Sequence, residues 1–409
     1  MQGAVGVPDD LMALQNVKTV WYTSIAGLWA CEWGVSGRLE RKGEECHATR
    51  DFCDVMRHGF VFRLVIFTDR EEALRKYRLS HETLSAKEFQ EQFLQHSFLP
   101  SHTALVKNQA LQNPAFLPAV RLAKLWAASQ MLSRSVPEFL LEELMVHVFV
   151  THQPLTPSRG FLLLLHLLTQ FDWKSSTLVI DGNGSLDGEA IAAALQAVET
   201  QRQASAQAVC IVTPFDLASQ CTRLAPSAPA WNHLLRVAQN TLRTLHKKWE
   251  EEDVKGVFAP PMRDFDVVLT LREDVLSPQK GWVKRVGGKM ENRGSAYKCS
   301  LAKNVMMDRS RLLVGYNPEE CVLEAVEKAV GVGGVVMMNC EFGRKIGISW
   351  KPTYFLPLKM SMASVADCCP LKKGNGGKKE DVVLVRSVFD VVKRIEDALG
   401  DVLLKVEFV

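Results

Sequence analysis

The 409-residue sequence lacks the cysteine spacings that zinc ribbons and disulfide-rich domains use. It has ten cysteines, but no Cys-x-x-Cys pair and no regular interval between them. Cys46, His47, Cys53 and His58 come nearest to a set of four zinc ligands, yet adjacent ligands and irregular gaps match no usual zinc spacing. We interpret these four as ordinary residues, and we expect reduced thiols, no metal and no cofactor.

Long apolar runs are also missing. The longest, Phe161 to Leu168, is interrupted by His166 and falls short of the roughly 18 residues that a membrane span needs. The first ten residues show neither the basic nor the apolar region of a signal peptide. We therefore expect a soluble intracellular protein, in the cytosol or nucleus, without membrane contact.

Known catalytic motifs are absent: the sequence has no Walker loop, Rossmann glycine fingerprint, HExxH or GxSxG. Asp264 and Asp266 are the best catalytic candidates, because two carboxylates on alternate strand residues can hold the two divalent ions of nucleotidyl transfer. Such an enzyme also needs a Gly-Ser loop shortly upstream, and residues 255–261 contain none. We interpret the Gly-Ser segment at 182–189 as a turn followed by a helix N-terminus. An active nucleotidyltransferase using Asp264 and Asp266 stays the alternative.

The charge balance points to a local basic surface. The formal net charge of +3 is too small for a protein that binds nucleic acid over its whole surface. Residues 280–311, however, hold nine Lys or Arg and two acids, with Trp282 and Tyr297 among them. A basic segment of this kind suits phosphate contact, although a solvated loop without a partner is the alternative. The candidate RNA-binding residues are Lys280, Lys284, Arg285, Lys289, Arg293 and Lys298.

Hydrophobic periodicity predicts an α+β protein whose middle part is mostly helical. The expected helices cover about 9–29, 114–151 (a pair), 161–171, 186–203, 318–330 and 387–399. The expected strands cover about 59–67, 177–180, 208–212, 265–271, 334–338, 345–350 and 402–408. The near-continuous apolarity of 59–67 predicts burial on both faces, and 265–271 reads as an alternating strand.

Several short strings, in this order along the chain, together resemble the C-terminal half of the Nrap family, the nucleolar RNA-associated proteins also called nucleolar protein six. The strings are 61–64, 121–126, 160–162, 171–174, 211–214, 257–261, 264–267, 315–318 and 347–353. Each string is weak alone, and their order and spacing carry the resemblance.

The resemblance implies an architecture of three parts. Residues 1–110 would be a truncated nucleotidyltransferase-like domain that lacks its first strand and Gly-Ser turn. Residues 111–253 would be a helical domain like that of poly(A) polymerase and oligoadenylate synthetase, and residues 254–409 a terminal α+β domain carrying the basic loop.

The resemblance also implies a function. The family is nucleolar and belongs to the small-subunit processome, where it assists pre-rRNA processing through RNA and protein binding. We therefore expect a non-catalytic scaffold of ribosome biogenesis in the nucleus and nucleolus, with a degenerate nucleotidyltransferase fold. Its expected partners are pre-ribosomal RNA and other small-subunit processome proteins.

Overall fold

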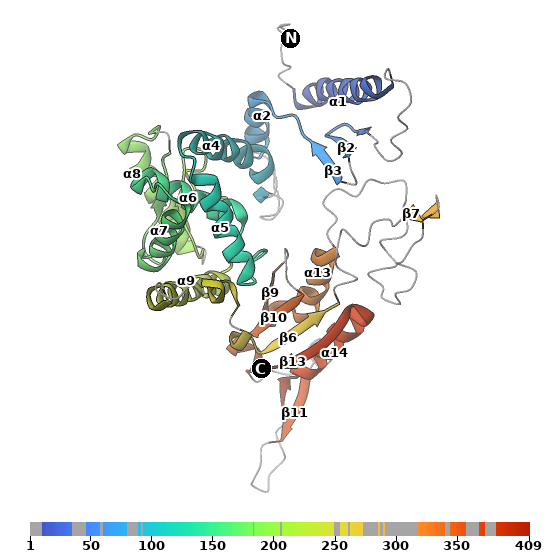
Figure 1. Ribbon diagram of the computed structural model, residues 1–409, viewed down its shortest axis with the longest axis vertical. Helices are drawn as coiled ribbons and strands as arrows, with labels where there is room; N and C mark the ends of the chain where they lie inside the picture. Colours follow the sequence, from blue (N-terminus) through green and yellow to red (C-terminus); the bar gives the residue numbers. More distant parts are fainter. Residues whose placement is uncertain are drawn as a thin grey trace.

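The computed structural model describes the chain in three groups of elements, coloured along the sequence in Figure 1. The described residues are 10–34, 46–57, 60–79, 89–90, 93–182, 184–204, 207–248, 254–260, 262–272, 285–286, 289–290, 318–339, 344–356, 368–372 and 382–409. Helices and sheets are mixed, and the middle group is mostly helical, which confirms the predicted fold class. Among the described residues, no helix has both the length and the apolarity to cross a membrane.

The first group is a small antiparallel sheet beside two helices (Figure 1). Helix α1 (Leu11–Gly34) packs on strands β1 (Cys46–Ala48) and β2 (Cys53–Arg57), and β2 pairs with β3 (Phe60–Leu64) before α2 (Asp69–Leu79). The buried core is small and contains Tyr22, Cys53 and Val55.

The prediction that the strand around β3 is buried on both faces was wrong. Phe62 is 52% exposed and Val65 55% exposed. The physical reason is position: in the sheet order β1-β2-β3 this strand is at the edge, and α1 packs mainly on β1 and β2. Helix α1 likewise buries Leu14 and Tyr22 but leaves Val20 63% exposed.

In the described residues, the middle group is a bundle of six helices and one π-helical turn, η1 (Leu94–Phe98). The helices are α4 (Leu99–Gln112), α5 (Phe116–Ser129), α6 (Glu138–His152), α7 (Pro157–Gln170), α8 (Gly188–Ala204) and α9 (Ala228–Lys248). Strands β4 (Leu178–Val179) and β5 (Ile211–Val212) pair in parallel on either side of α8 in the sequence. Helices α5, α7 and α9 pack in succession around a core that includes Trp126, Phe161 and Trp231.

The third group is a four-stranded antiparallel sheet in the order β13-β6-β10-β9. The strands are β6 (Val267–Leu271), β9 (Gly334–Met338), β10 (Lys345–Trp350) and β13 (Leu403–Phe408). Helices α13 (Pro318–Val330) and α14 (Val388–Leu399) pack together and share a core with the sheet. Strands β11 (Cys368–Lys372) and β12 (Val382–Arg386) form a separate hairpin.

Local signals set the ends of these helices as expected. Helix α13 ends at Gly331, which has φ +58°, a conformation that glycine adopts without steric cost. The Ser387 side chain accepts a hydrogen bond from the Asp390 amide and caps α14. Strand β6, in contrast, is not alternating: four of its five residues are buried, because Val268 belongs to the core of the bundle and Val267, Leu269 and Leu271 belong to the core shared with α13 and α14.

The second and third groups share one hydrophobic core. Phe265, Val268 and Met337 belong to the same buried cluster as the helices of the middle group. Leu132, just after α5, forms a parallel bridge with Met338 at the edge of β9. The helical bundle therefore extends the sheet at this point.

Candidate functional site

The two acids proposed for metal binding, Asp264 and Asp266, have structural partners. Asp264 lies in the short 3-10 turn η3 (Met262–Asp264), where its carboxylate forms an ion pair with Arg236 at 3.1 Å. The Asp266 carboxylate accepts a hydrogen bond of 2.7 Å from the Trp350 amide. Both acids precede β6, so they are not alternate residues of that strand.

Arg236 connects Asp264 to a buried histidine. Its Nη2 donates to His233 Nδ1 at 2.8 Å, and the His233 ring lies 5.8 Å from the ring of Phe265. Burial and the Arg236 charge lower the pKa of His233 to about 4, although Asp264 opposes this shift. His233 is therefore neutral near pH 7, as an acceptor of the arginine hydrogen bond must be.

The acids of the first group are also engaged. Asp54 accepts two hydrogen bonds from Arg63, both at 2.9 Å, and the guanidinium lies over the ring of Phe52 at 3.4 Å. Asp51 is an exposed turn residue that contacts Gln15. Arg63 thus has an acid partner on the neighbouring strand that the sequence did not reveal.

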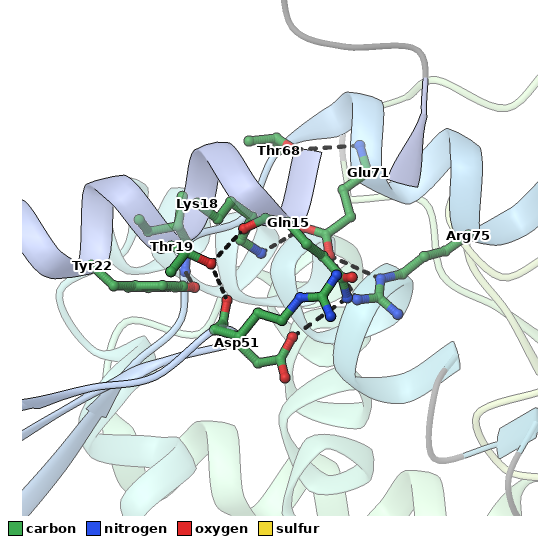
Figure 2. Close-up of polar contacts among 10 residues, drawn as sticks. Gln15, Lys18, Thr19, Tyr22, Asp51, Thr68, Glu71 and Arg75 are labelled. Atoms are coloured by element: carbon green, nitrogen blue, oxygen red, sulfur yellow. Dashed lines mark hydrogen bonds and ion pairs between the residues drawn. The ribbon is translucent and has the colours of Figure 1, made fainter. Parts of the chain in front are cut away.

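A buried polar cluster holds α1, the β1–β2 turn and α2 together (Figure 2). Glu71 accepts hydrogen bonds from Lys18 at 2.7 Å and from Arg75 at 2.8 Å. Burial opposes ionisation of Glu71, but the hydrogen bonds from the two cations outweigh it and lower its pKa. The Tyr22 hydroxyl accepts a hydrogen bond from the Ile66 amide. With its donors and acceptors mutually paired, this cluster is a structural junction.

The segment at 182–189 forms the predicted turn and helix start. The Asp181 carboxylate accepts from the Ser185 and Leu186 amides, and Asp187 accepts from the Ala190 amide at the N-terminus of α8. Cys46 and Cys53 lie on paired strands with their sulfur atoms 3.2 Å apart. In the part of the chain that the structure describes, no group of three or more His, Cys, Asp or Glu could hold a metal ion.

The basic segment is described only in part. Arg285 and Lys289 belong to a two-stranded hairpin of β7 (Arg285–Val286) and β8 (Lys289–Met290). The other four candidate RNA-binding residues, Lys280, Lys284, Arg293 and Lys298, lie outside the described residues. RNA contact at these six positions stays a prediction.

The structure also contains a cavity of about 610 Å³ that the sequence did not reveal. Phe171 and Trp173 follow α7, and Trp231 lies in α9; all three line the cavity. The Trp173 and Trp231 rings meet edge to face with centroids 5.0 Å apart. In the sequence, the alternation of aromatic and charged residues at 171–174 is the one local signal for this cavity. The sequence does not show that Trp231, from the distant helix α9, completes the wall.

Two family models match the chain in succession. Residues 6–113 match the Nrap protein nucleotidyltransferase domain 4, and residues 113–260 match the Nrap protein PAP/OAS1-like domain 5.

Curated relatives match along almost the whole chain. Nucleolar protein 6 of Xenopus tropicalis is 28% identical over 97% of this chain and 34% of its own length. The human nucleolar protein 6 is 26% identical over 91% of this chain, and that of Drosophila persimilis is 22% identical over 90%. The chain spans about a third of the length of these relatives.

Proposed function

Because the chain belongs to the Nrap family, we propose that it is a non-catalytic scaffold of ribosome biogenesis that acts in the nucleolus. In this role it binds pre-ribosomal RNA and other small-subunit processome proteins, and it assists pre-rRNA processing. The observation that carries the proposal is the order of the matches: two successive Nrap domains, and relatives named nucleolar protein 6 along 97% of the chain.

The geometry of the acids supports a non-catalytic role. Two-metal nucleotidyl transfer needs carboxylates that face one open site with free oxygen atoms. Asp264 forms an ion pair with Arg236 on α9, and Asp266 accepts a hydrogen bond from the Trp350 amide. Each acid therefore has a structural partner of its own. Asp54 in the first group is neutralised by Arg63.

The test measures incorporation of a radiolabelled nucleotide into an RNA primer with Mg²⁺, for the natural chain and for Asp264→Asn with Asp266→Asn. We expect no incorporation by either protein, and we expect both to sediment with small-subunit precursor particles from cell extracts. Incorporation by the natural chain that the double substitution abolishes would favour the active nucleotidyltransferase instead. Failure of the natural chain to sediment with the particles would contradict the scaffold role.

A further inference from the structure

Helix α9 presents a polar face without any acid. None of its 21 residues is Asp or Glu. Its exposed residues recur at spacings of four and three, so they lie along one side of the helix. Five of them, Asn232, Arg236, Gln239, Arg243 and His246, follow this spacing and are named here the α9 stripe; Ala228, Pro229 and Asn240 are exposed as well. Helix α7, which packs beside α9, also lacks Asp and Glu, and its His166 ring lies 6.3 Å from that of His246.

The α9 stripe leads into the aromatic cavity. Asn232, Arg236 and Gln239 line the cavity as well as belonging to the stripe. The cavity volume of about 610 Å³ falls in the range of sites that hold small ligands or single residues of a larger one. Its wall includes Phe171 and Trp231, whose buried indole N–H has no acceptor in the described part of the chain.

Three cations among the described residues line the cavity, and two of them have acid partners outside its lining. Lys174 and Arg236 are exposed, and Arg236 is 53% exposed despite its pairing with Asp264. Arg202 donates to the carbonyls of Lys174 and Ser176 and lies 3.8 Å from the Glu199 carboxylate.

Among the described residues that line the cavity, Asp172 is the one carboxylate, and it accepts hydrogen bonds from the Lys174 amide and from Ser175. Those hydrogen bonds, from Ser175 first, lower the pKa of Asp172. Because Arg236 pairs with Asp264 and Arg202 with Glu199, the cations left for a phosphate among the described residues are Lys174 at the cavity and Arg243 on the α9 stripe.

We propose that the α9 stripe and the aromatic cavity bind single-stranded RNA, with the phosphate backbone along α9 and one unpaired base in the cavity. This inference rests on the proposed function and names a site for its RNA contact. Arginine contacts phosphate, and aromatic walls accept a planar base. The amides of Asn232 and Gln239 can both donate and accept, as a base edge requires, whereas an acidic peptide would need cations alone.

The first experiment measures binding of a fluorescent single-stranded RNA of about 12 nucleotides at several salt concentrations. Arg243 is exposed on α9, so Arg243→Glu should alter the surface without disturbing the fold. We expect about tenfold weaker binding and a salt slope flatter by about 0.7, the value of one phosphate contact on a single strand. The matched control is Lys107→Glu, the same charge reversal on an exposed residue of α4, which Figure 1 places at the opposite end of the bundle from α9.

The second experiment tests the cavity. Ala228 is exposed at the start of α9 and lines the cavity, so Ala228→Trp should fill it from the surface. The natural chain should bind the RNA about tenfold more tightly than an RNA of equal length without bases, since a stacked base contributes roughly 1–3 kcal/mol. The filled variant should bind the two RNAs alike, and its melting temperature should match that of the natural chain.

The outcomes separate this site from the proposed function. If the natural chain binds RNA and Arg243→Glu or Ala228→Trp changes nothing, the site proposal is overturned and the scaffold role stands. If a polyglutamate peptide displaces the fluorescent RNA as well as unlabelled RNA does, and the same variants lose binding of the peptide, the face binds acidic proteins and the RNA assignment is wrong. If the natural chain binds no RNA at all, RNA binding in the proposed function fails together with this site.

Discussion

Glu142 and Glu143 are neighbours in α6 with opposite electrostatic surroundings. Glu142 pairs with His102 and Lys124, each at 2.6 Å, and these hydrogen bonds outweigh its burial and lower its pKa. Glu143 is fully buried, and neither of its carboxylate oxygens has a hydrogen-bond partner among the described residues. Burial, with a smaller contribution from the Asp216 charge, raises the pKa of Glu143 well above its ordinary value.

The substitution Glu143→Gln should therefore stabilise the protein as the pH rises. A raised carboxyl pKa in the folded state contributes stability below about pH 4.5, and this contribution is lost as the pH rises toward the folded pKa. The gain from Glu143→Gln should grow by up to about 1.4 kcal/mol per pH unit across that window. Thermal melts from pH 5 to 8 measure it.

Glu142→Gln is the control with the opposite sign, because its lowered pKa gives stability above about pH 4.5. It should destabilise the protein at pH 7. A constant melting difference for Glu143→Gln at every pH would show that Glu143 is already ionised in the folded state.

At the scale of elements, the two candidate RNA-binding features, the α9 stripe and the basic segment, have different structural settings. The α9 stripe is held on a regular helix beside a cavity. The basic segment from Lys280 to Arg311 instead contains one described hairpin, β7 with β8. An electrostatic contribution from this segment depends on its charges more than on their exact placement.

Reversal of Lys284, Arg285 and Lys289 to Glu should weaken binding to all RNA sequences alike, because phosphate contacts position a chain without reading bases. We expect the natural chain to show a slope of log affinity against log salt of about −2 to −3.5, for roughly three to five contacts. The triple variant should flatten that slope by about 2. Titrations with a pre-ribosomal RNA fragment measure it.

The control reverses Lys107, Arg121 and Lys393, three exposed helical residues, and so changes the net charge by the same amount. If the triple variant and the natural chain have the same affinity and the same salt slope, the basic segment is a solvated loop without an RNA contact.

At the scale of the whole molecule, the ring of Phe265 is one of the contacts that join the sheet to the helical bundle. A Cβ atom at Gly347 in β10 would lie 2.5–2.6 Å from the ring of Phe265, so the strand can pass this ring only as glycine. The same ring approaches His233 of α9. A substitution at Gly347 should therefore destabilise both the sheet and the helical bundle.

Gly347→Ala should destabilise the protein by about 1–3 kcal/mol, the usual cost of overpacking a core. Hydrogen exchange should accelerate in α9 as well as in β10, because Phe265 belongs to the core of the bundle. Gly256→Ala is the control, since nothing lies within 4 Å of a Cβ there. Exchange that accelerates only in β10 would contradict a shared core.

The sequence by itself determined most of the elements and the family. The cap at Ser387, the proline at the first position of α13, the stop at Gly331 and the apolar helix at 161–171 are local signals, and local backbone preferences act wherever the chain goes. The order of the family-like strings required no structure either, because it is a property of the chain.

Tertiary structure decided burial and partners. The apolar segment at 60–64 gives an exposed edge strand, and 267–271 gives a central one, because neighbours and not composition determine which faces are covered. The pairings Arg63 with Asp54, and Arg236 with Asp264, also join residues that no sequence period connects. The aromatic cavity depends on Trp231 of α9 meeting Trp173, which follows α7, a contact that the packing of α7 against α9 creates.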